Sequence, residues 1–424
     1  MMKPQLITGV SESTMQSQKK MDGCTENLVE EFDTGRERLA GALTLGALLI
    51  AFIMANSPLY EAYWFVHHTP VSIQVGDFGL DKPLIAWINK GLMVFFFLLV
   101  SLEIKREMLE GRLASLHQLA LPALAALGGM VVPAVIYLSI NGGDPVAARG
   151  WAIPMATDIV LALAALSLFR RRVPDGLFVF LIALAIFDDV GAILVIALFY
   201  PETLSVSALM VAALGVALLF TLNRFKVVAT TPYVLAGVFL WVALLNSGIH
   251  ATLAGVVVAL AIPLNGVTNG VAYSPLREME SRLRPWVALG IVPVFAFFNA
   301  GIALPPGLGA DVLLTPLTLG IVLGLFLGKQ LGIFGITWLA AKLGIGRLPE
   351  GVTWVHIYGV ALLAGIGFTM SLFITSLAFV DAEQLAAARF AIIIGSLISA
   401  VVGLFVLHFY SPELAAESTS RQKG

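Results

Sequence analysis

Long apolar stretches, each closed by charged residues, proline or glycine, follow one another along the chain from about residue 39 to residue 410. A transmembrane helix needs about 20 predominantly apolar residues, and most of these stretches approach or exceed that length. They predict twelve transmembrane helices, of which the seventh and eighth are short and nearly joined at Asn246, Ser247 and Gly248. The approximate bounds are 39–57, 87–104, 118–140, 151–169, 176–200, 204–222, 232–246, 248–264, 286–304, 315–340, 354–379 and 385–410.

The composition is that of a membrane protein. Of the 424 residues, 58% are hydrophobic and 12% are charged, whereas charged residues make up about 25% of a soluble globular protein. The formal net charge of −2 provides no basic face for nucleic acid, and the single cysteine, Cys24, provides neither a disulfide framework nor a thiolate-rich metal site. Residues 1–38 are polar and contain no secretory signal. We therefore expect an N-terminal tail over 1–38, one transmembrane domain over 39–410 and a C-terminal tail over 411–424.

The basic residues predict the orientation. When the predicted loops are assigned alternately to the two sides of the membrane, with the N-terminus inside, 20 of the 25 Lys and Arg residues fall inside. The four outside are Lys82, Lys90, Arg149 and Arg389. Cytoplasmic loops carry an excess of Lys and Arg, so both tails are predicted to be cytoplasmic.

One outside segment does not have the pattern of a helix. Residues 69–81 alternate apolar and polar side chains around Gly76 and Asp77, which predicts a short β-hairpin. A lone two-stranded hairpin is marginal in water and leaves its edges open. It can pair with its copy in a homodimer, or it can simply fold over the ends of its own helices.

Four ionisable residues lie well inside the predicted spans: Asp158, Asp188, Asp189 and Lys329. A charge near the bilayer centre costs at least about 2.5 to 3.5 kcal/mol on insertion scales, so each one requires a partner or a function. Three carboxylates and one ammonium leave an imbalance of −2 that a cation or protons can correct. We interpret these four residues as the functional core of a cation transporter.

Asp188 and Asp189 lie near the middle of the fifth span. Because adjacent helical residues point about 100° apart, one is expected to line an ion pathway while the other pairs with a neighbouring helix. Close carboxylates in a low dielectric titrate together, as proton exchange requires. The alternative is an interhelical ion pair with no role in transport.

Two spans contain signs of a break. Pro154 lies just before Thr157 and Asp158 in the fourth span, and the eleventh contains GIGFTMSLFITS. Proline removes a helical hydrogen bond, and interrupted helices in matching positions of two halves indicate a transporter site. The glycines of the eleventh span can instead reflect close helix packing. Lys329, in the tenth span, is expected to pair with a carboxylate of the fifth or to face the negative ends of broken helices.

Other polar residues are less specific. His250 is either a proton relay or a histidine bonded to backbone at a helix end, and Glu103 and Glu107 belong to a charged cluster that can attract cations. The chain has no phosphate-binding loop, no HExxH and no convincing Ser/His/Asp set. We therefore expect neither an enzyme nor a resident cofactor.

These motifs together resemble those of the NhaA-type sodium/proton antiporters, from about Arg36 to Tyr410. The resemblance is carried by WAIPMATDIV, LALAIFDDVGAILVIALFY, SGIHATLAGVVVALAIPL, RPWVALGIVPVFAFFNAG, LGKQLGI and GIGFTMSLFI. This family is among the transporters in which inverted repeats are known. The resemblance implies an all-α fold of twelve helices, in which the fourth and eleventh cross as unwound chains and helices three to five are related to ten to twelve by inverted topology.

The resemblance also implies the transport roles. Cytoplasmic Na⁺ or Li⁺ is expelled by inward proton movement, electrogenically and with activation at alkaline pH, across a bacterial inner membrane by a hairpin-linked homodimer. Asp189 would be the main cation ligand, assisted by Asp158 and Thr157, while Asp188 pairs with Lys329. Hard monovalent cations prefer such oxygen ligands. The second proton carrier is either Asp188 or Lys329, and the residues considered for a pH response are Glu103, Glu107, His250 and Glu280.

The chain departs from the family pattern at a few positions. Lys90 stands where an acidic residue is common, Gln330 where proline is usual, and Arg284 and Ser281 where several members carry histidine. A sodium-coupled organic-solute symporter and a K⁺/H⁺ antiporter are the competing hypotheses. The first would need a second, roomier site, which the few buried charges do not indicate.

Overall fold

The computed structural model describes residues 35–410 except 77, 111–115, 171, 202–203, 269–270 and 304–313. The predicted tails, Cys24 included, therefore lie almost wholly outside the described residues, as does Asp77 of the predicted hairpin turn. After a first helix, Gly35–Ala55, the elements in chain order are α2 (Tyr60–His68), β1 (Pro70–Val75), β2 (Phe78–Pro83), α3 (Leu84–Trp87), η1 (Ile88–Leu92), α4 (Met93–Glu110), α5 (Leu116–Asn141), η3 (Ala147–Met155), α6 (Ile159–Ser167), α7 (Asp175–Phe199), α8 (Val206–Arg224), α9 (Thr230–Leu245), α10 (Leu253–Ala261), β3 (Gly266–Thr268), β4 (Val271–Tyr273), α11 (Pro275–Trp286), η4 (Val287–Ile291), α12 (Val292–Ala300), α14 (Pro316–Leu323), η5 (Gly324–Gly328), η6 (Gln330–Phe334), α15 (Gly335–Lys342), α16 (Trp354–Leu363), α17 (Phe368–Ala378) and α18 (Ala382–Tyr410).

The described residues form a polytopic helical membrane protein. Nine continuous helical segments among them are long and apolar enough to cross a membrane, and the bent pair α16 and α17 makes a tenth. The predicted seventh and eighth spans fall on α9 and α10, of 16 and 9 residues. Because these two are shorter than a full crossing, twelve crossings remain a prediction.

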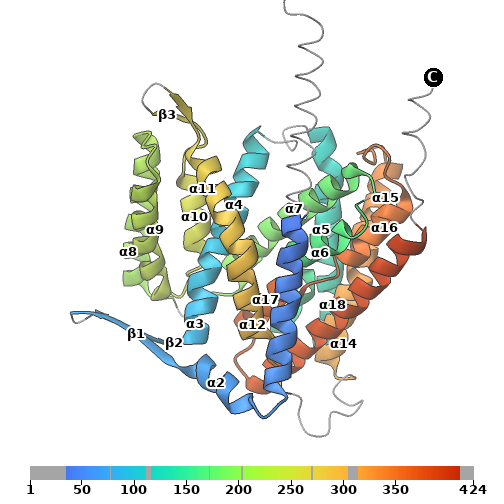
Figure 1. The fold of residues 1–424 in the computed structure, drawn as a ribbon, viewed down its shortest axis with the longest axis horizontal. Coiled ribbons are helices and arrows are strands. Elements are labelled where there is room, and N and C mark those ends of the chain that lie inside the picture. Colours follow the sequence, from blue (N-terminus) through green and yellow to red (C-terminus); the bar gives the residue numbers. More distant parts are fainter. Residues whose placement is uncertain are drawn as a thin grey trace, which may run out of the picture.

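The helices stand side by side in one bundle (Figure 1). Of the nine continuous spans, Ala147–Ser167 and Asp175–Phe199 are the most buried, whereas α8 lies at the edge and packs on α9. Large apolar side chains of α8 and α18 remain exposed, among them Leu214 and Val401. Lipid is the environment that such an outer surface requires.

Two small antiparallel hairpins lie at opposite ends of the bundle (Figure 1). In the first, β1 pairs with β2 from Pro70 opposite Pro83 to Val75 opposite Phe78, so it extends two residues beyond the predicted 69–81. Gly76 in its turn has φ +62°, a left-handed conformation that favours glycine. The second hairpin, β3 and β4, precedes α11.

The span that carries Lys329 packs unusually closely on its neighbours. Gly324, Gly328 and Gly332 occur every four residues along it and share one helix face. A Cβ on Gly324 would overlap Pro154, one on Gly328 would overlap Pro133, and one on Gly332 would overlap the backbone of Gly128. Small residues at this spacing allow helix backbones to approach each other, and here they bring Lys329 against the third and fourth spans.

Candidate ion-exchange site

Two broken spans cross at the centre of the site. In the fourth span, the 3₁₀ segment η3 ends at Met155, residues 156–158 have no helical structure, and α6 begins at Ile159. In the eleventh, α16 and α17 are separated by residues 364–367 and bent by 44°. The unwound chains bind each other, because the Asp158 N–H donates to the Ile366 carbonyl at 2.7 Å and Thr157 Oγ1 donates to the Ala364 carbonyl at 3.0 Å.

Asp158 caps both of the half-helices that start at the crossing. Its Oδ1 accepts the Leu161 N–H at 3.1 Å in α6, and its Oδ2 accepts the N–H and the hydroxyl of Thr369 in α17 at 3.0 and 2.6 Å. The N-terminal ends of helices carry partial positive charge. The carboxylate charge is therefore compensated by two helix ends, with no side-chain cation needed.

Lys329 lies at the opposite, negative side of the same crossing. Its Nζ donates to the carbonyl of Met155 at the end of η3, to Thr157 Oγ1 at 2.9 Å and to Asp188 Oδ2 at 3.0 Å. The side chain is 0% exposed, so the ammonium does not reach toward the membrane surface. It is held by one carboxylate, one hydroxyl and the end of one half-helix.

The tandem aspartates of α7 have different surroundings. Asp188 is paired with Lys329. The Asp189 side chain is 4% exposed, and no hydrogen bond or ion pair from the described part of the chain reaches it. Asp189 is therefore the one buried carboxylate of the site whose charge these residues leave without a direct partner.

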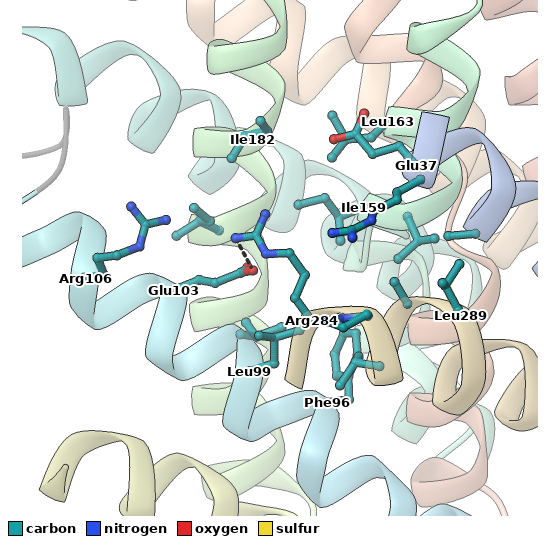
Figure 2. A pocket seen from close by; sticks show the side chains of 18 of the residues that line it. Glu37, Phe96, Leu99, Glu103, Arg106, Ile159, Leu163, Ile182, Arg284 and Leu289 are labelled. Atoms are coloured by element: carbon teal, nitrogen blue, oxygen red, sulfur yellow. Dashed lines mark ion pairs between the residues drawn. The ribbon is translucent and has the colours of Figure 1, made fainter. Parts of the chain in front are cut away.

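A cavity of about 290 Å³ opens beside the crossing (Figure 2). Its inner wall includes Ile159, next to Asp158, and Ile186, one helical turn before Asp189. Its mouth is charged. Arg284 binds Glu103 at 2.9 Å and Glu280 at 2.8 Å, and Arg106 binds Glu107 at 2.7 Å and Glu280 at 2.9 Å.

The structure thus groups three of the four residues considered for a pH response and separates the fourth. Glu103 and Glu107 line the mouth of the cavity, and Glu280 binds Arg106 and Arg284, which line it too. His250 is buried, and its Nε2 is hydrogen-bonded to the Tyr200 carbonyl at the end of α7. This contact with backbone at a helix end matches the simpler of the two interpretations given to His250.

Some residues of the site were not singled out by the sequence. Ser396 Oγ of α18 accepts the N–H groups of Gly367 and Phe368, at 3.1 and 3.3 Å, and so caps the start of α17. Tyr358 of α16 donates to Gln330. The only signal for either was a polar side chain in an apolar span, which is weak for Ser and Tyr.

The geometry suits a transported cation better than a resident metal. Within the described ranges, no group of three or more His, Cys, Asp or Glu side chains is placed to hold a metal ion. Asp158 already accepts three hydrogen bonds, so the carboxylate oxygens left for a cation are those of Asp189 and Oδ1 of Asp188, which has no hydrogen-bond partner among the described residues. One carboxylate with backbone and hydroxyl oxygens nearby suits a weakly held monovalent ion.

The family model described as Na⁺/H⁺ antiporter 1 matches residues 33–407. The chain belongs to this family. The match confirms the antiporter family indicated by the motifs, and the Na⁺/H⁺ antiporter family is one of ion transporters. The chain is thus a Na⁺/H⁺ antiporter and a multi-pass membrane protein.

Curated members of the Na⁺/H⁺ antiporter family match nearly the whole chain. Na⁺/H⁺ antiporter NhaA 2 of Saccharophagus degradans is 51% identical over 88% of this chain and 97% of its own length. NhaA of Rhodospirillum rubrum is 52% identical over 89% and 96%, and NhaA of Vibrio campbellii is 50% identical over 91% and 97%.

Proposed function

We propose that this antiporter carries Na⁺ or Li⁺ outward and H⁺ inward at the carboxylate of Asp189. The observation that carries the proposal is the local balance of charge. Asp158 is compensated by two helix ends, and Asp188 and Lys329 form a neutral pair. Asp189 alone requires one added positive charge, which either a proton or a monovalent cation supplies. Competition for one site makes the two ions exchange.

Thr157, Asp158 and the carbonyls of the crossing complete the cation site in this proposal. The cavity beside Ile159 and Ile186 gives the cation its route from the cytoplasm, and rearrangement of the two broken spans opens the other side. Exchange is electrogenic if a second group releases a proton for each Na⁺ bound. Asp188 and Lys329 are the two candidates, since breaking their bond frees both to titrate.

The cluster at the mouth of the cavity is proposed to set the pH response. Glu103, Glu107 and Glu280 share two arginines, so protonation of one carboxylate redistributes the ion pairs of the others. Arg284, at a position where the resemblance implies histidine in several members, keeps its charge at all physiological pH values. His250 is the remaining candidate, at the far end of α7.

Membrane orientation and assembly are part of the proposal. The distribution of Lys and Arg supports cytoplasmic tails in a bacterial inner membrane. The open edges of the β1–β2 hairpin support a homodimer in which two copies pair. Deleting residues 70–83 should then convert a dimer into a monomer in detergent, as measured by light scattering, and an unchanged mass would refute the hairpin contact.

The direct test is dissipation of ΔpH in everted vesicles after addition of Na⁺, Li⁺ or K⁺. We expect Na⁺ and Li⁺ to dissipate ΔpH in the wild type without any organic solute, which separates antiport from symport. K⁺ tests the competing K⁺/H⁺ exchange. Asp189→Asn should abolish the response. Asp175→Asn is the matched control, because Asp175 begins the same helix with a side chain that is 77% exposed.

Two results would overturn the proposal: full exchange in Asp189→Asn, or equal loss in both variants at equal amounts of protein. Lys329→Ala identifies the second proton carrier. Exchange that persists but no longer responds to membrane potential would assign that role to Lys329. Exchange that stays electrogenic would assign it to Asp188.

A further inference from the structure

The helix that carries Lys329 is widened on both sides of this residue. The π-helical segments η5 and η6 meet at Lys329. π-helical turns are rare, and inside α-helices they occur frequently at functional sites. A lysine at such a junction needs support from outside its own helix to keep a fixed position.

Gln330 provides a link to another helix. Its Nε2 donates to the Phe326 carbonyl in η5 at 2.8 Å, and its Oε1 accepts the hydroxyl of Tyr358 in α16 at 2.7 Å. Gln330 is buried, and the Tyr358 ring packs edge-on against Phe334 of η6 with ring centres 5.5 Å apart. The amide therefore connects both π-helical segments to the first half of the eleventh span.

These contacts form a closed chain that includes Lys329. Lys329 binds Thr157, Thr157 binds the Ala364 carbonyl just past the end of α16, and α16 returns through Tyr358 to Gln330. Gln330 and Lys329 are neighbours in the chain. A shift of α16 therefore reaches Lys329 by two routes, through Thr157 and through Gln330.

We propose that Gln330 and Tyr358 are positioning residues that hold Lys329 against Asp188 and couple it to movement of α16. This inference rests on the proposed function, in which the Lys329 and Asp188 pair sits beside the cation carboxylate Asp189. The charged groups that share the crossing with Lys329 are Asp188 and Asp189 of α7 and Asp158 of the unwound chain. An ammonium released from Asp188 can turn to Asp189 and compete with Na⁺ for that carboxylate. Half-maximal exchange then requires more Na⁺ and a higher pH, at which fewer of these amines carry a charge.

Tyr358→Phe and Gln330→Leu test the contact in the everted-vesicle assay. Each should move the pH of half-maximal exchange upward by about 0.4 to 1 unit and raise the apparent KM for Na⁺ roughly two- to tenfold, the range expected for one neutral hydrogen bond. The double variant should be no worse than the more affected single variant, since both remove the same bond.

Tyr233→Phe is the matched control. Its hydroxyl is bonded to the Val227 carbonyl at 3.1 Å, and Tyr233 belongs to α9, away from the crossing. It should leave the pH profile unchanged. The proposal fails if Tyr358→Phe keeps the wild-type pH profile and KM, or if the effects of the two single variants add. Asp189→Asn in the same vesicles tests the cation site alone. Its loss of exchange together with an unchanged Tyr358→Phe would reject the positioning role but keep the proposed function.

Discussion

At the scale of single residues, the site compensates three of its four buried charges in two different ways and leaves the fourth without a direct partner. Asp158 uses helix ends, Asp188 and Lys329 use each other, and Asp189 has no direct partner among the described residues. Removing one member of a buried pair leaves the other as an uncompensated charge, whereas removing both leaves an apolar contact. Single and double variants of Asp188 and Lys329 therefore distinguish the contribution of this pair to stability from its role in transport.

Lys329→Met should therefore destabilise the protein by about 3 to 5 kcal/mol, because Asp188 keeps its charge without a partner. Adding Asp188→Leu should recover most of the lost melting temperature but should not restore wild-type transport. Thermal melting in detergent, followed by size-exclusion chromatography, measures the first effect and the vesicle assay the second. A double variant less stable than Lys329→Met would contradict this account.

A second residue prediction concerns His67, which lies in α2, outside the predicted spans. Burial, reinforced by the charges of Arg389 and His68, lowers the pKa of His67 from its usual 6.5 to about 4. Between pH 6.5 and 4 the unfolded chain binds more protons at this position than the folded one, so stability must fall as pH falls.

His67→Phe should flatten this dependence. The ring of His67 packs against Tyr63, Trp64 and Phe298, a set that accepts phenylalanine. Melting temperatures of the two proteins should converge above pH 7 and separate below pH 6, with the variant more stable. Parallel curves over pH 4 to 8 would show that His67 is not the group responsible.

At the scale of elements, the sequence predicted the breaks but not what the broken chains bind. Pro154 and the glycines around Gly365 marked both interruptions, and the scarcity of charge made Lys329 conspicuous. Which carbonyl Thr157 would reach, and that Asp158 would cap two helices, depends on how distant segments cross. The lengths of the seventh and eighth spans were also uncertain, because Asn246 and Gly248 can lie in either a loop or a helix end.

The close approach of the third and tenth spans depends in part on Gly128 and Gly332, whose backbones contact each other. Gly332→Ala places a methyl group into the backbone of Gly128. Since overpacking costs about 1 to 3 kcal/mol and displaces the helix that holds Lys329, we expect reduced stability and a raised KM for Na⁺. Gly335→Ala is the control on the same span, because a Cβ there meets nothing within 4 Å. Equal behaviour of the two variants would contradict the close approach.

At the scale of the whole molecule, the two hairpins lie at opposite ends of the bundle (Figure 1). Once the orientation of the bundle is known, the side of the membrane on which each hairpin lies is known as well. The excess of Lys and Arg predicts that β1 and β2 face outward and that α11 begins on the cytoplasmic side. Gln74 in β1 and Ser281 in α11 are exposed and suit cysteine labelling in a Cys24→Ser background. We expect an impermeant maleimide to label Gln74→Cys in spheroplasts and Ser281→Cys only in everted vesicles. The reverse pattern would invert the direction of transport through the cavity, because Glu103 and Arg284 at its mouth lie on the same side as α11.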